Sequence, residues 1–105
     1  MKRVIFVSLL ALSSVASELH AQEVGNRQEG LAIAQEVCSE CHAIRNGQIF
    51  SPNSRSPTFT ELATTPGMTV AALTVALTTP HAGMPMFKLT ADQRNDVITY
   101  ILSLR

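Results

Sequence analysis

The chain has 105 residues, of which 46% are hydrophobic and 15% are charged, and its formal net charge at pH 7 is +0. A neutral chain without a basic run argues against nucleic acid or an anionic membrane surface as its main partner. Its length suffices for one small domain, yet it carries only four phenylalanines, one tyrosine and no tryptophan. Small domains with so few large aromatic side chains often need a disulfide, a metal or another bound group to be stable.

The first 21 residues have the order of a secretory signal peptide: a basic start, an apolar run ending at Ala16, and a short polar stretch ending at Ala21. The apolar run is too short to cross a bilayer, which takes roughly 20 residues. We expect cleavage after Ala21, with Ala16 or Ser17 as alternative sites, and an uncleaved amphiphilic anchor as the competing interpretation. The mature domain would then be residues 22–105, located in the periplasm.

The first half of this domain predicts one helix followed by a long loop. Residues 22–30 are polar and are expected to fray, whereas apolar positions share one helical face between Gly30 and Val37. Residues 43–58 are rich in Asn, Ser, Gly and Pro, which is typical of a loop. Residues 57–63 could hold a short helical turn.

The second half predicts two further helices separated by a loop at residues 81–87. Residues 69–78 carry apolar side chains at helical spacing, and Pro80 ends that segment. Thr90 and Gln93 have the spacing of a capping box and therefore mark the start of the last helix. This helix has an apolar stripe of Val97, Tyr100, Ile101 and Leu104. The pattern predicts an all-α domain with long loops.

The strongest chemical signal is the segment Cys38-Ser39-Glu40-Cys41-His42. Two thiols separated by two residues can reach the two vinyl groups of a haem and form thioethers. His42, directly after the second thiol, then lies over the ring face and can bind the iron as the proximal ligand. This spacing is typical of c-type haem attachment, and it predicts one covalent haem.

Two other interpretations of the cysteine pair are weaker. A disulfide is permitted in an exported protein, and a thioredoxin-like pair has the same spacing, but the latter needs a βαβ setting that the sequence does not predict. A zinc site needs four ligands, usually two such pairs, and this chain has one pair.

From Gly30 through Leu104 the sequence resembles the monohaem class I cytochromes c, in particular small bacterial members with a Met-Pro step before the last helix. In that family the haem motif lies near the N-terminus, and a methionine from a later loop binds the other face of the iron. The segment Gly83-Met84-Pro85 matches that step. The resemblance implies the class I fold, with three to four helices and long loops wrapped around one haem.

Two softer matches follow from the same resemblance. In the family, a glycine and an aromatic residue meet where the terminal helices cross, and Gly30 and Tyr100 stand at these positions. A residue without Cβ allows two helix backbones to approach closely. Pro57 resembles the family proline whose carbonyl accepts the ring N–H of the proximal histidine, although it could equally be a turn proline.

The residues alone leave the second iron ligand open. The resemblance favours Met84, while Met86 and His81 in the same loop are alternatives, and an open position is another. Met68 begins a helix and is explained as a core side chain. The residues themselves do not separate Met84 from Met86, because in extended chain both point the same way.

These observations predict a periplasmic one-electron carrier with His42 and Met84 as iron ligands. It would not be an enzyme, and it would work, most simply as a monomer, with redox partner proteins: a donor dehydrogenase and an acceptor oxidase or reductase. After signal cleavage we expect no stable membrane insertion. The alternatives are a haem subunit of a larger periplasmic dehydrogenase or reductase, and a peroxidase-like or gas-binding protein with a labile sixth ligand.

Overall fold

The computed structural model describes residues 24–105, and the expected signal peptide lies outside the described residues. The described chain is helical, and its only β-type pairing is an isolated bridge between His81 and Met84. The expectation of an all-α fold with long loops is therefore confirmed. The helical elements are α1 (Arg27–Ile33), the π-helical turn η1 (Ala34–Cys38), α2 (Phe59–Thr64), α3 (Val70–Thr78) and α4 (Ala91–Leu102).

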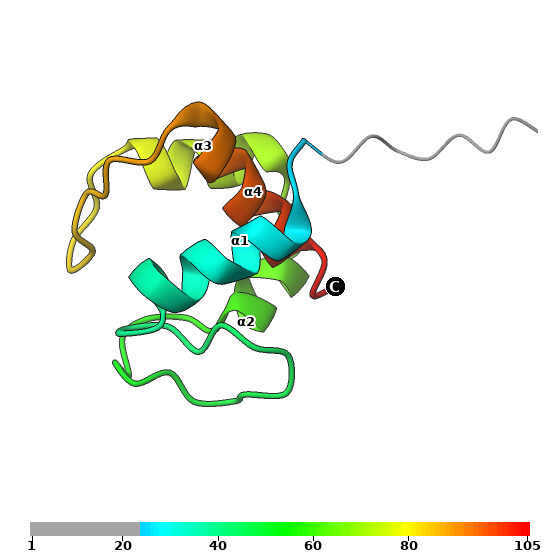
Figure 1. The fold of residues 1–105 in the computed structure, drawn as a ribbon. Coiled ribbons are helices and arrows are strands. Elements are labelled where there is room, and N and C mark those ends of the chain that lie inside the picture. Colours follow the sequence, from blue (N-terminus) through cyan, green and yellow to red (C-terminus); the bar gives the residue numbers. More distant parts are fainter. Residues whose placement is uncertain (1–23) are drawn as a thin grey trace, which may run out of the picture.

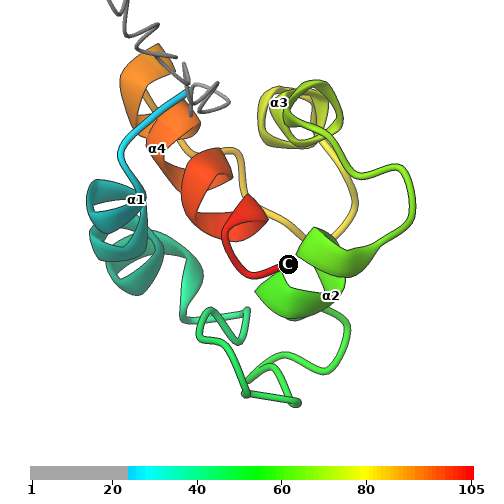
Figure 2. The same ribbon diagram turned by 90° about the vertical axis from the view of Figure 1, so that its right-hand side faces the viewer.

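Helix α4 is the central element of the domain. It contacts each of the other three α-helices, and its largest interface is with α1. Figure 2 shows α1 on one side of α4, with α2 and α3 on the other. The five consecutive residues from Val97 to Ile101 are all buried, because α4 is covered on several faces at once.

The first helix begins earlier than the sequence predicts. Asn26 caps it, and its side-chain oxygen accepts hydrogen bonds from two backbone N–H groups of the first turn, at 2.9 and 3.1 Å. The backbone N–H of Asn26 donates to Oδ1 of Asp96, at 2.7 Å. The prediction that residues 22–30 fray is therefore wrong from Arg27 to Gly30, because an N-cap and a contact with α4 order this polar stretch.

Threonine caps start the remaining helices. The expected capping box of Thr90 and Gln93 is present at the start of α4. A second capping box, formed by Thr58 and Glu61, starts α2. Helix α2 is too short to be stable alone, so it depends on this cap and on the burial of residues such as Phe59. The predicted short helical turn is thus confirmed.

The crossing of α1 and α4 requires a glycine. A Cβ on Gly30 would overlap the carbonyl oxygen of Asp96 and would lie 2.9 Å from Cβ of Tyr100. Gly25 is under a similar constraint, because its Cβ would lie 2.5 Å from the backbone of Asn95. The structure therefore confirms the predicted meeting of Gly30 and Tyr100, which Figure 1 shows as the crossing of α1 and α4.

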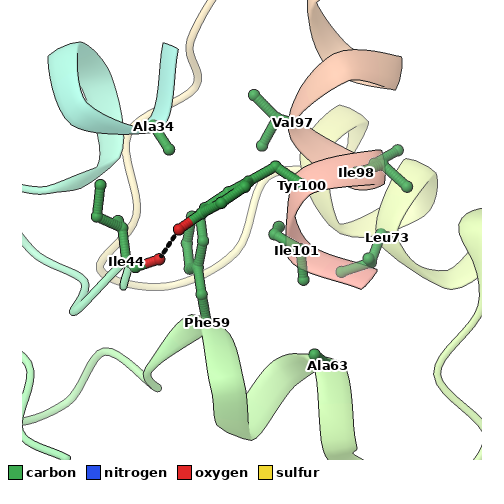
Figure 3. Packing of buried hydrophobic residues seen from close by; sticks show 9 residues of the cluster. All are labelled: Ala34, Ile44, Phe59, Ala63, Leu73, Val97, Ile98, Tyr100 and Ile101. Atoms are coloured by element: carbon green, nitrogen blue, oxygen red, sulfur yellow. Dashed lines mark hydrogen bonds between the residues drawn. The ribbon is translucent and has the colours of Figure 1, made fainter. Parts of the chain in front are cut away.

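Tyr100 also joins α4 to the long loop that follows the cysteines. Its hydroxyl donates a hydrogen bond to the carbonyl oxygen of Ile44 at 2.6 Å, drawn as a dashed line in Figure 3. The Phe59 ring lies beside it, with 6.3 Å between ring centroids. Burial raises the pKa of the Tyr100 phenol, against a smaller lowering by the charge of Arg45. The phenol is therefore a neutral donor that fastens residues 43–58 to the core.

We predict that Gly30→Ala destabilises the haem-loaded protein by about 2–3 kcal/mol, because the new methyl group must push α1 away from α4. The free energy of unfolding from denaturant titration measures this. Gln28→Ala, on the exposed side of the same helix, is the control and should change it by less than about 0.5 kcal/mol. Equal stability of the two variants would contradict the close crossing.

Candidate functional site

The cysteine segment forms a tight turn at the end of the first helix. Over Ala34–Cys38 the helix widens to π geometry, and the last bond of this turn runs from the N–H of Ser39 to the carbonyl of Ala34, at 2.9 Å. The N–H groups of Cys41 and His42 then both donate to the carbonyl of Cys38, at 3.2 and 3.0 Å. A π turn within an α-helix is frequent at functional sites, and here it ends at Cys38, the first of the two cysteines.

His42 is held by a hydrogen bond from its ring. Nδ1 lies 2.6 Å from the carbonyl oxygen of Pro57. Because a carbonyl only accepts, Nδ1 carries the proton and the Nε2 lone pair stays available for a metal. The Phe59 ring packs against the imidazole, with centroids 5.6 Å apart and planes 51° apart. The role expected of the Pro57 carbonyl is present, so Pro57 does more than make a turn.

An apolar cavity lies next to His42. It measures about 650 Å³ with its open mouth, and its walls come from the cysteine turn, α2, α3, α4 and the loop that carries His81 and Met84. Besides the Cys38 thiol, the groups in its wall that have iron-ligand chemistry are imidazoles and thioethers: His42, His81, Met68 and Met84.

The thiols fit a covalent haem better than a reactive disulfide or thiolate. Both cysteines are free, and Cys38 lines the apolar cavity. Burial raises the pKa of the Cys38 thiol to about 11, so the thiol is neutral near pH 7 and a poor nucleophile there. A thioether carries no charge, so its burial has no cost from removing a charged group from water. Cys41 lies on an adjoining cavity that it shares with Cys38, His42 and Met84.

The methionines that the sequence does not distinguish differ in exposure and in the cavities that they line. Met84 is partly buried and lines three adjoining cavities together with His42. Met86 lines none of these three, and 51% of its surface is exposed. Met68 lines the apolar cavity and packs against the core, as expected of a core side chain. His81 is exposed and lines the same apolar cavity.

Sequence reasoning missed the support behind His42. The capping box of Thr58 and Glu61 fixes the backbone directly after Pro57, and therefore fixes the carbonyl that orients His42. The spacing of Thr58 and Glu61, with an apolar run behind it, was the available signal.

A more polar hollow beside His42 and Met84 is lined by Asn53 and Arg55. These two side chains stand where a charged edge of a bound group could meet them.

Comparisons with known proteins indicate which family the chain is similar to. The family described as "Cytochrome C oxidase, cbb3-type, subunit III" matches residues 25–101. The chain is also similar to a protein called cytochrome c-552 from Bradyrhizobium diazoefficiens. The two are 33% identical over 97 residues, which cover 92% of this chain and 89% of that relative. No solved structure matches the chain.

We predict that the exported protein carries one haem that stays bound in denaturing gels and acidified organic solvent, because each thiol saturates one vinyl group. Intact mass should equal the chain from Gln22 plus one haem. Exchange of both Cys38 and Cys41 for Ser should abolish the link and most of the folded protein. Glu40→Gln, between the two cysteines and exposed, is the control and should keep the haem. A mass without haem in the unaltered chain, after expression with a maturation system, would contradict the assignment.

Proposed function

The chain belongs to the monohaem class I c-type cytochromes, which are haem c electron-transfer proteins, and we propose that it is a periplasmic one-electron carrier. We propose further that Cys38 and Cys41 hold the haem, while His42 and Met84 bind the iron. The observation that carries this assignment is the bond of His42 Nδ1 to the Pro57 carbonyl, on a cavity that His42 shares with Met84.

The protein's part in electron transfer is to hold ligands still. When bound, the haem supplies the reversible one-electron chemistry of its iron. Pro57 keeps the imidazole of His42 in one tautomer and orientation, and this hydrogen bond raises its basicity toward a metal. A ligand set that does not move between the two oxidation states keeps the energy of reorganisation small.

The loop of Met84 contains a tight turn that restricts the position of this side chain. The N–H of Met84 donates to the carbonyl of His81 at 3.3 Å, and Gly83 has a φ of +78°, which completes a tight turn that glycine adopts without strain. Pro85 follows and restricts the backbone further. A stiff turn of this kind suits a thioether that must stay in place, and ligation by His and Met raises the reduction potential.

Electron transfer through this site needs no side chain to act as acid, base or nucleophile, so we propose a carrier and not an enzyme. Its partners would be redox proteins: a donor dehydrogenase and an acceptor oxidase or reductase. Met86 and Phe87, 51% and 40% exposed, line a hollow next to Met84 and Cys38. They offer a small apolar surface for brief contacts of a monomer with such partners.

The periplasmic location rests on the sequence of residues 1–21 and on the family, whose members are typically exported. Within residues 24–105, no helix is long and apolar enough to cross a membrane.

A second candidate is a haem subunit of a larger complex. It is favoured by the family description, which names a subunit of an oxidase. Against it stands the cytochrome c-552 relative, whose length this chain nearly covers. Purification from the native periplasm under mild conditions separates the two: a carrier elutes alone, whereas a subunit elutes with its complex.

We predict that Met84→Ala lowers the reduction potential by roughly 0.1–0.3 V, within the span of about 0.8 V that axial ligands cover, because the thioether stabilises ferrous iron. Potentiometric titration measures this. Met86→Ala is the matched control from the same loop and should leave the potential nearly unchanged. A lower reduction potential in Met86→Ala alone would identify Met86 as the ligand. If the potential fell in neither variant, the methionines of this loop would be excluded as ligands.

A further inference from the structure

His81 and Met84 are placed side by side by the backbone. They form an isolated antiparallel bridge, closed by the hydrogen bond from Met84 N–H to the His81 carbonyl. Residues directly opposite one another in an antiparallel pair point to the same face, with Cβ atoms about 4.5–5.5 Å apart. The tight turn at Gly83 therefore presents an imidazole and a thioether in the same direction.

The cavities confirm that the two side chains face a common space. His81 and Met84 both line the apolar cavity next to His42. They also both line the more polar hollow beside it and the hollow that contains Met86. The part of the chain that the structure describes thus places two side chains with iron-ligand chemistry in one short turn, of which Met84 is the partly buried one and His81 the exposed one.

We propose that His81 is a reserve iron ligand, which binds when the thioether of Met84 is lost. The inference rests on the proposed function, in which Met84 is the regular ligand. The loss would follow oxidation of Met84 by hydrogen peroxide or hypochlorite. The oxidant transfers one oxygen atom to the sulfur, which gives up two electrons, and the oxidant leaves as water or chloride.

The exchange itself changes no oxidation state at the iron. The Met84 sulfur would give up its coordinate bond, and a His81 ring nitrogen would supply the lone pair for the new one. Because the turn already places both residues on one face, the exchange needs a shift of one loop and not a rearrangement of the fold. The iron would stay closed to small molecules in the oxidised protein, at a lower reduction potential.

The first experiment compares Met84→Ala with the double variant Met84→Ala, His81→Gln, both loaded with haem. We expect Met84→Ala to be low-spin by optical spectroscopy and the double variant to be high-spin. Carbon monoxide should bind the ferrous Met84→Ala protein about 10- to 100-fold more slowly than it binds the ferrous double variant. This is the rate expected if the site is open in roughly 1–10% of the Met84→Ala molecules. Equal spin state and equal binding rate in the two variants would overturn the proposal.

A second experiment needs no substitution at Met84. The unaltered protein and His81→Gln are oxidised with hypochlorite until peptide mass mapping shows sulfoxide at Met84. The unaltered protein should stay low-spin, and His81→Gln should become high-spin. A high-spin product from both proteins would overturn the reserve role while leaving Met84 as the regular ligand. High-spin His81→Gln before any oxidation would instead contradict the proposed ligation, since His81 would then be the regular ligand.

Discussion

The hydrogen bond between His42 Nδ1 and the Pro57 carbonyl joins the two halves of the site. Its donor, His42, follows the turn that carries Cys38 and Cys41. Its acceptor, the Pro57 carbonyl, directly precedes the capping box of α2. Its length of 2.6 Å and the packed ring of Phe59 leave the imidazole little freedom. The fold thus orients a metal ligand through a backbone group, whose position depends on the start of a short helix.

The domain is built around the cavity beside His42. Helices α2, α3 and α4 each turn apolar side chains toward the space beside His42, while α4 uses Tyr100 to hold the loop of Ile44. A chain with so few aromatic residues leaves this space to a bound group. Covalent attachment, ligation and core formation therefore act together, and the loss of one weakens the others.

Local signals made much of this predictable. The cysteine spacing, the cap at Thr90 and the Gly30–Tyr100 crossing depend on residues close in sequence or on one family pattern, and the structure agrees with the cap and the crossing. The start of α1 was missed because Asp96, 70 residues away, helps to hold Asn26. The difference between Met84 and Met86 also depends on the folded loop, since their exposure follows from the turn at Gly83 and not from composition.

In the proposed site, the iron lies between His42 and a methionine thioether of the loop before α4. The most direct measurement is the near-infrared absorption of the purified, unaltered protein in its oxidised form. Sulfur bound to ferric iron is expected to give a weak charge-transfer band there, accompanied by a low-spin c-type visible spectrum. A low-spin spectrum without this band would contradict methionine ligation, and a high-spin spectrum would show that the sixth position is open.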